Sequence, residues 1–457
     1  MEYLYQESAI AFRKRRRGLS PAQLIVISFA VAIAIGTLLL SLPVAHAPDA
    51  EIGLLEALFT ATSAVCVTGL IVVDTGSDYR LFGQTVIMLL IQAGGFGILT
   101  LGTLVALATG RRVGFRERRN LQTQLNALQV GGVVRLLRSL LMMVFGVELL
   151  GALLLYGRFA QVEGVGPGAF FALFHSISAF NNAGFALYAN SLEGYVGDLL
   201  INLTVMTLII LGGLGFVVIV NLVSRYRQPQ RTPLNLHTKI VLTFSAFLLG
   251  VATVIYLVLE WTNPATLGPL GLPGKGLAAL FHAVTPRTAG FNTLAVGSMH
   301  ESSLLFTMLL MFIGGNPGST AGGIKTVTFF VLVGSAWSLS RGRGELSLFN
   351  RRLTIDIVVR AGVIALISMM LAGAALTALA ITDAEKGMLP LAFETFSALG
   401  TVGLSMGITA ELSAPGKLII ILLMFLGRLG PLTLALALIE GEPEKRIKYP
   451  AEEVVIG

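Results

Sequence analysis

The sequence has very little charge for its length. Only 12% of its 457 residues are charged, whereas 54% are hydrophobic and the mean hydropathy is +0.81. Soluble globular domains carry about 25% charged residues, so this composition excludes a disordered chain, a collagen and an ordinary water-soluble enzyme. The single cysteine, Cys66, has no second thiol in the chain to pair with, which excludes an intrachain disulfide framework.

The sequence contains long runs of apolar residues with few charges. A bilayer core of about 30 Å is crossed by about 20 apolar residues in a helix, and eight runs of this kind occur. The first is too long for a signal-peptide core and has no small-residue cleavage site after it, so we expect it to be retained. The eight predicted spans are Leu24–Val44, Leu81–Ala108, Leu140–Tyr156, Leu199–Val223, Ile240–Val258, Leu304–Trp337, Ala361–Ile381 and Leu418–Ile439.

The basic residues gather at one end of these spans. Of the 32 lysines and arginines, 24 precede the first span, follow the eighth, or lie in the connections after the second, fourth and sixth spans. By the positive-inside rule those connections and both termini are cytoplasmic. The net charge of +7 therefore reflects topology, and we predict no nucleic-acid binding. The basic connections could contact anionic membrane lipids or dock the acidic surface of a regulator, and the residues leave both open.

The four connections at the opposite end share an internal repeat. Each contains a short apolar stretch with a phenylalanine, and a glycine follows that phenylalanine after nine or ten residues. Self-similarity of this kind indicates repeated units. The phenylalanines are Phe59, Phe174, Phe281 and Phe393, and the glycines are Gly69, Gly184, Gly290 and Gly403.

The repeat predicts an all-α integral membrane fold. It consists of four M1-P-M2 repeats (long helix, short re-entrant pore helix, long helix) in pseudo-fourfold symmetry around one pore, with eight full transmembrane helices plus four re-entrant pore helices. The second long helices repeat too, at Gly94-Gly95, Gly212-Gly213, Gly314-Gly315 and Gly427-Arg428. We divide the chain into a basic cytoplasmic N-terminus (1–20), repeats 1 to 4 (21–110, 111–230, 231–344 and 345–440) and a cytoplasmic C-terminal tail (441–457).

Such units suit a cation pore. A short helix that enters from outside and stops near mid-bilayer points the negative end of its dipole inward, and the irregular backbone after it must line protein or water. Glycine there can adopt a positive φ and turn its carbonyl to the axis, where carbonyl rings replace an ion's hydration shell. No acid lies in these turns, which favours a monovalent cation over Ca²⁺. The predicted selectivity filter consists of Val67, Thr68, Gly69, Asn182, Ala183, Gly184, Thr288, Ala289, Gly290, Thr401, Val402 and Gly403.

The sixth span is interrupted by glycines, a proline and polar residues, which do not make a stable lipid-facing helix. We interpret the interruption as a mobile loop that blocks the pore, and the alternative is a packing kink with small-residue helix contacts. Arg428, a charge inside the eighth span, is a latch on that loop, an electrostatic barrier, or half of a buried ion pair. Lys325 could act likewise or snorkel inward. The predicted gate consists of Gly314, Gly315, Asn316, Pro317, Gly318, Ser319, Thr320, Ala321, Gly322, Gly323, Lys325 and Arg428.

Catalytic signals are missing. Ile324 stands where a P-loop requires lysine, so we predict no nucleotide bound by this chain. No His-Glu-x-x-His, paired aspartates or Ser/His set lies in the membrane spans, and we predict that the chain is not an enzyme.

Glu148, inside the third span, is expected to be hydrogen-bonded between helices. Arg287 beside the third turn could pair with Glu56, Glu394 or another acid, or repel cations at the mouth.

Four turn motifs and the interrupted sixth span carry a family resemblance. The motifs are Thr68-Gly69-Leu70, Asn181-Asn182-Ala183-Gly184-Phe185, Arg287-Thr288-Ala289-Gly290-Phe291 and Val402-Gly403-Leu404. Together with residues 314–323 they resemble the Trk/Ktr/HKT superfamily of K⁺ transporters, most of all its KtrB-type subunits. The resemblance covers about residues 20–457. It implies K⁺ uptake across the plasma (inner) membrane, a pore in each monomer, a homodimer, and gating by a cytoplasmic nucleotide-binding RCK ring (KtrA-like). In that superfamily a serine at the first filter glycine accompanies Na⁺ permeation, so Gly69 favours K⁺. The sequence leaves open activation by Na⁺ and the alternative of a secondary cation transporter with alternating access.

Overall fold

The computed structural model describes residues 21–97, 133–228, 230, 233–342, 347–348 and 351–430. The predicted N-terminal segment 1–20 and the tail 441–457 lie outside these residues, as do the end of repeat 1, the start of repeat 2 and the last residues of the eighth span. The described part is helical, with one short hairpin formed by β1 (Ser347–Leu348) and β2 (Arg351–Arg352).

Four units of the same order follow one another along the chain. Each begins with a long helix: α1 (Pro21–Leu40), α6 (Val133–Glu163), α10 (Leu236–Glu260) and α14 (Ile355–Thr382). A short helix follows: α2 (Leu54–Cys66), α7 (Val165–Asn181), α11 (Leu272–Val284) and α15 (Met388–Gly400). The closing helices are α3 (Leu81–Phe96), α8 (Leu199–Leu214) with α9 (Phe216–Arg227), α12 (Glu301–Phe312) with α13 (Thr326–Ser340), and α16 (Ala414–Leu429). Short 3-10 turns lie in the connections at η1 (Pro43–Ala45), η2 (Glu193–Tyr195), η3 (Val296–Ser298), η4 (Ala384–Lys386) and η5 (Thr409–Glu411).

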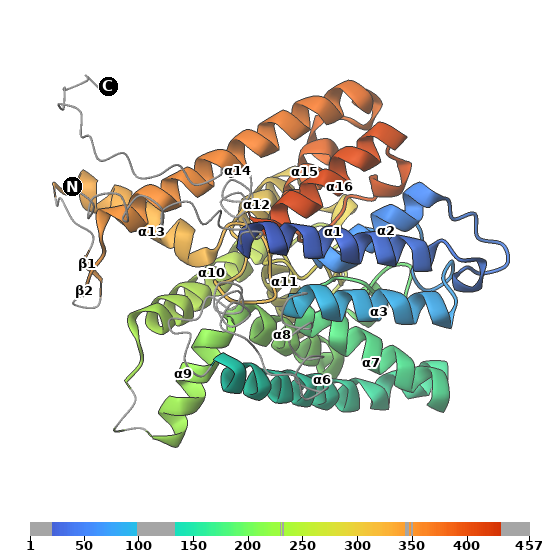
Figure 1. Ribbon diagram of the computed structural model, residues 1–457, viewed down its shortest axis with the longest axis horizontal. Coiled ribbons are helices and arrows are strands. Elements are labelled where there is room, and N and C mark those ends of the chain that lie inside the picture. Colours follow the sequence, from blue (N-terminus) through green and yellow to red (C-terminus); the bar gives the residue numbers. More distant parts are fainter. Residues whose placement is uncertain are drawn as a thin grey trace, which may run out of the picture.

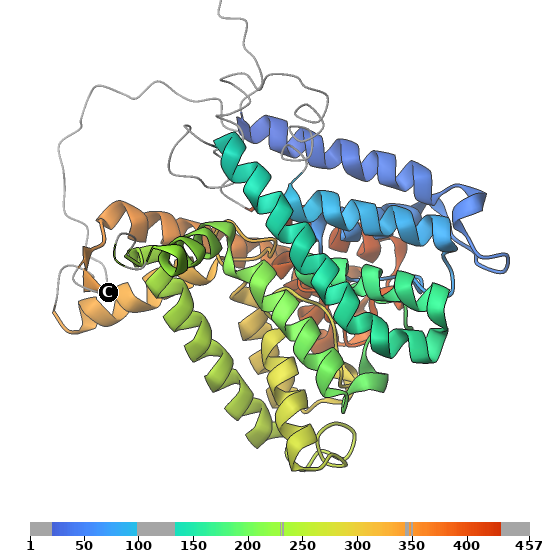
Figure 2. The same cartoon turned by 90° about the horizontal axis from the view of Figure 1, so that it is seen from below.

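The four units close into a ring (Figures 1 and 2). The closing helix of each unit packs against the short helix of the next one: α3 on α7, α8 on α11 and α12 on α15. The last contact, α16 on α2, returns from the fourth unit to the first. In Figure 1 the red helix α16 therefore lies beside the blue helix α2, although these two helices come from opposite ends of the described chain.

Burial separates the short helices from the long ones. The phenylalanine shared by the four short helices is fully buried in each of them. The long helices expose apolar side chains instead, such as Leu38, Leu150 and Leu366, which are 67%, 58% and 62% exposed. By length and composition four described helices can cross a membrane, and the pair α8–α9 makes a fifth if it is counted as one span. Apolar surface of this extent suits a lipid environment.

Two predicted spans are broken. The break in the sixth span is confirmed, since α12 ends at Phe312 and α13 begins at Thr326. The prediction of one continuous helix over the fourth span is wrong, because α8 and α9 meet at Gly215 with a bend of 100°. Gly215 has a φ of 93°, and a Cβ there would lie 2.6 Å from the carbonyl oxygen of Pro317. The bend makes room for the loop that interrupts the sixth span.

Candidate functional site

The four turns after the short helices share one backbone path. Two residues before each glycine stands a residue with positive φ: Val67 (57°), Asn182 (59°), Thr288 (70°) and Thr401 (49°). The glycines have φ of 93°, 72°, 80° and 92° in chain order. Residues other than glycine are uncommon at positive φ, so their occurrence at matched positions shows that the repeat extends to the backbone.

The four glycines meet at one place. A Cβ built on each glycine would collide with the carbonyl oxygen of the residue before the next repeat's glycine. The distances are 2.4 Å from Gly69 to Ala183, 3.0 Å from Gly184 to Ala289, 2.7 Å from Gly290 to Val402 and 2.1 Å from Gly403 to Thr68. The series returns to its starting strand, so the strands form a closed ring with a carbonyl oxygen between each pair of neighbours. Only glycine fits at these positions.

A cavity of about 290 Å³ lies on one side of the ring, and all four glycines line it. Polar groups from the following turns line it as well: Tyr188, Asn190, Ser191, Glu193, Asn292, Ser405 and Thr409. Glu193 is the carboxylate among these described lining residues, and it accepts a hydrogen bond from the amide of Asn292 at 2.8 Å. Burial raises the pKa of Glu193, and that hydrogen bond opposes the shift. We call this cavity the mouth.

A hydroxyl at the same place in each repeat fastens the turn from behind. The four hydroxyls belong to Ser63, Ser178, Thr285 and Ser397. In the first and fourth repeats the hydroxyl oxygen accepts the N–H of the glycine, at 3.0 and 3.1 Å. In the second and third it donates to the carbonyl of the residue after the glycine, at 2.8 and 2.5 Å. The sequence analysis missed these residues, although a Ser or Thr five or six positions before each glycine was the available signal.

The loop that interrupts the sixth span is a closed hairpin. The N–H of Gly314 donates to the carbonyl of Ile324 at 2.8 Å, and the Thr326 hydroxyl donates to the carbonyl of Gly314 at 2.6 Å. At its far side the carbonyl of Gly318 accepts the N–H of Phe216 at 2.8 Å, which ties the loop to the bend between α8 and α9.

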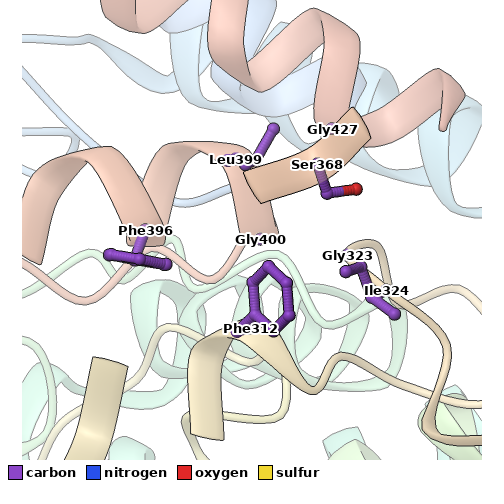
Figure 3. Close-up of a pocket in the computed structure, with 8 residues that line it drawn as sticks. All are labelled: Phe312, Gly323, Ile324, Ser368, Phe396, Leu399, Gly400 and Gly427. Carbon is purple, nitrogen blue, oxygen red and sulfur yellow. The ribbon is translucent and has the colours of Figure 1, made fainter. Parts of the chain in front are cut away.

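This loop lies against the ring on the side away from the mouth. A Cβ on Gly322 would lie 1.9 Å from the hydroxyl oxygen of Thr401, and one on Gly323 would lie 3.2 Å from the carbonyl oxygen of Gly400. Figure 3 shows the end of α15, at Leu399 and Gly400, facing Gly323 across a cavity of about 20 Å³. Gly322 and Gly323 of the predicted gate are therefore brought next to the fourth turn of the ring.

Arg428 holds the loop. Its guanidinium donates to the carbonyl of Thr320 in the loop and to the carbonyl of Gly94 in α3. Within the described part of the chain no acid forms an ion pair with Arg428, so this geometry favours the latch over the buried ion pair.

Two further side chains restrain the loop. The ammonium of Lys325 donates to the carbonyl of Ala321 at 2.7 Å, and the amide of Asn316 donates to the carbonyl of Gly213 in α8 at 3.0 Å. Asn316 and Arg428 connect the loop to helices of the first, second and fourth repeats, whereas Lys325 ties the loop to itself.

The expectation for Glu148 is confirmed. Its carboxylate accepts hydrogen bonds from the amides of Gln92 and Asn181, both at 3.0 Å, and joins α3, α6 and α7. The suggested pairing of Arg287 with Glu56 or Glu394 is wrong, because Arg287 donates to the hydroxyl of Ser245 at 3.1 Å. Glu56 lies 3.4 Å from the ammonium of Lys417 instead, and Glu394 is engaged by its own loop.

Comparison with known proteins agrees with this arrangement. The chain matches the family model described as TrkH, cation transport protein, over residues 8–448. It belongs to the TrkH family. Two relatives in that family are Ktr system potassium uptake protein B of Bacillus subtilis, 44% identical over 96% of this chain and 97% of the relative, and its namesake from Vibrio alginolyticus, 39% identical over 97% and 96%.

The fold is also that of a solved TrkH family member. The crystal structure of the potassium transporter TrkH from Vibrio parahaemolyticus matches with a TM-score of 0.72 at 18% identity, over 93% of this chain and 86% of that one. At this identity the match concerns the fold alone. With the family match it confirms the expected all-α membrane fold with pseudo-repeats and the expected resemblance to the Trk and Ktr proteins.

Proposed function

We propose that this TrkH family member takes up K⁺ across the plasma (inner) membrane through the ring of four glycine turns. The observation that carries the proposal is the closed ring of carbonyl oxygens, one between each pair of neighbouring strands, opening into a single mouth. Carbonyl rings of this kind replace the hydration shell of an alkali ion. The relatives from Bacillus subtilis and Vibrio alginolyticus are named as potassium uptake proteins, which supports K⁺ as the transported ion.

Unpaired oxygens beside the ring support the filter assignment. The buried hydroxyl oxygens of Thr68, Thr288 and Thr401 have no hydrogen-bond partner among the described residues. Buried polar atoms are normally paired, so three unpaired oxygens at the turns of the ring support a path for a cation there. We assign the selectivity filter to the three residues of each turn, 67–69, 182–184, 288–290 and 401–403.

We assign the gate to residues 314–323 with Lys325 and Arg428. The loop lies against the inner side of the ring and is held at several carbonyls, so its release opens the path. The signal for release comes from a cytoplasmic RCK ring that binds the nucleotide. The relatives' names place them in a Ktr system, which supports a partner subunit. We further propose a homodimer with both termini cytoplasmic.

The competing function is a secondary cation transporter with alternating access. The bend at Gly215 and the broken sixth span favour it, because broken helices occur in such transporters. The closed ring argues for a pore, since transporter repeats are often inverted whereas these four units contact one another in the same order.

Uptake of ⁸⁶Rb⁺ or K⁺ into liposomes tests the proposal, with wild type compared with Gly69→Ser. A Cβ at Gly69 would lie 2.4 Å from the carbonyl oxygen of Ala183 at a φ of 93°, so we expect serine to disturb the ring and weaken discrimination against Na⁺. If Gly69→Ser discriminates between K⁺ and Na⁺ as well as the wild type does, the filter assignment is contradicted. A single-file current identifies a pore, whereas saturation at turnover-limited rates would identify the carrier.

A further inference from the structure

The residue that follows the buried phenylalanine of each short helix is polar in all four repeats. These residues are Thr60, His175, His282 and Glu394, each 2% exposed or less. A buried polar side chain needs a hydrogen-bond partner. Among the described residues, His175 and Glu394 contact the strand that follows the glycine, whereas Nε2 of His282 has no hydrogen-bond partner.

Glu394 holds the turn that follows the fourth glycine. Its carboxylate accepts the N–H of Met406 at 3.2 Å and the hydroxyl of Thr409 at 2.9 Å, and it also accepts the hydroxyl of Ser405. Met406 is the third residue after Gly403. Ser405 and Thr409 line the mouth, so Glu394 holds the wall of the mouth from behind.

His175 does the same in the second repeat with different chemistry. Nδ1 lies 2.8 Å from the carbonyl of Phe171 and donates to it, which leaves Nε2 as the acceptor. Nε2 accepts the N–H of Leu187 at 3.3 Å, and Leu187 is the third residue after Gly184. Two unrelated side chains therefore accept the N–H at the same position of two strands, and these strands lie opposite each other in the ring order.

The third repeat lacks this contact. His282 is as deeply buried as His175, but within the described part of the chain its Nε2 has no hydrogen-bond partner. It packs edge-on against Tyr256, with ring centroids 4.6 Å apart. His282 is thus a matched control for His175, because the residue type, helix position and burial agree while the contact to the strand is missing.

We propose that Glu394 and His175 are positioning residues that hold the outer ends of the fourth and second filter strands and so determine how strongly the ring prefers K⁺ to Na⁺. The inference rests on the proposed function. A strand that shifts inward brings its carbonyl oxygens to distances that suit a smaller ion, and the N–H held three residues after the glycine prevents that shift. The acting quantity is the position of an acceptor atom, not the charge of Glu394.

Three variants of Glu394 separate position from charge. Glu394→Gln keeps an oxygen at the same reach and loses the charge, whereas Glu394→Asp keeps the charge on a side chain one methylene shorter. We expect Glu394→Gln to retain the K⁺ over Na⁺ preference of the wild type. Glu394→Asp draws the acceptor away from the N–H of Met406, and Glu394→Ala removes all three hydrogen bonds of Glu394. In both variants the preference for K⁺ should fall by at least about fivefold to tenfold, the equivalent of one hydrogen bond.

The measurement is the competition of Na⁺ with ⁸⁶Rb⁺ uptake by the full chain in liposomes, after each variant elutes as a single peak in detergent. Because a closed loop keeps the wild-type flux low, the proposed function itself is contradicted if neither the wild type nor a chain lacking residues 316–321 takes up ⁸⁶Rb⁺. Loss of preference in Glu394→Gln with retention in Glu394→Asp overturns the inference, because charge would then be the acting quantity.

The histidines give the second test. His175→Ala should lower the preference, and His282→Ala should leave it as in the wild type. An equal fall in both variants overturns the inference, since the loss would then follow from a cavity in the short helix. An unchanged preference in His175→Ala overturns it as well.

Discussion

Replacing Arg428 with glutamine removes the guanidinium that joins the loop to α16. It removes two hydrogen bonds, one to the carbonyl of Thr320 in the loop and one to the carbonyl of Gly94 in α3. A hydrogen bond to a charged group contributes about 1.5–3 kcal/mol, and only the bond to Thr320 restrains the loop itself. The ratio of open to closed loop should therefore rise by about 10- to 150-fold.

The assay is ⁸⁶Rb⁺ uptake into liposomes without a regulatory subunit, where a closed loop keeps the wild-type flux low. We expect Arg428→Gln to raise this flux. Arg428→Lys keeps the charge but loses the planar fork that reaches two carbonyls, so its flux should be intermediate. Lys417→Gln is the matched control, because Lys417 lies on the same helix and contacts Glu56 rather than the loop. Its flux should equal that of the wild type.

Two results would refute the reasoning. An unchanged flux in Arg428→Gln, with normal assembly, would mean that the hydrogen bond to Thr320 does not keep the loop closed. The second result is a wild-type flux in Arg428→Lys together with a raised flux in Arg428→Gln. It would mean that the charge acts as an electrostatic barrier and that the hydrogen bonds do not keep the loop closed.

Three further predictions follow from other contacts. Deleting residues 316–321 should raise ⁸⁶Rb⁺ flux without the regulator, and an unchanged flux would contradict the gate assignment. Glu148→Ala leaves the amides of Gln92 and Asn181 without their carboxylate, at a cost of about 1–3 kcal/mol for each buried group. The melting temperature of Glu148→Ala in detergent should therefore lie below that of Glu148→Gln. Equal melting temperatures would contradict this account. Because burial raises the pKa of Glu193, this carboxylate loses its charge at a higher pH than an exposed glutamate. K⁺ uptake at low K⁺ should therefore decline as the outer pH is lowered, and Glu193→Gln should abolish that pH dependence; an identical pH profile would show that another group titrates.

Features that depend on neighbouring residues could be read from the amino-acid sequence. Apolar runs long enough to cross a membrane predict helices, and four phenylalanine–glycine pairs at one spacing predict four equal units. The break after Phe312 is also local, since glycines and Pro317 do not continue a helix. In each case the reason lies in a few consecutive residues, whose apolar character and permitted φ angles are the same in any surroundings.

Contacts between distant segments could not be read in this way. The bend at Gly215 depends on the carbonyl of Pro317, about a hundred residues later, and a glycine alone does not indicate where a helix turns. The same holds for Arg428 and Thr320, for Glu394 and the strand it holds, and for Arg287, whose partner is a hydroxyl rather than an acid. Sequence chemistry specifies that a buried polar group must find a partner, whereas the closing of the ring determines which carbonyl, hydroxyl or N–H lies within its reach.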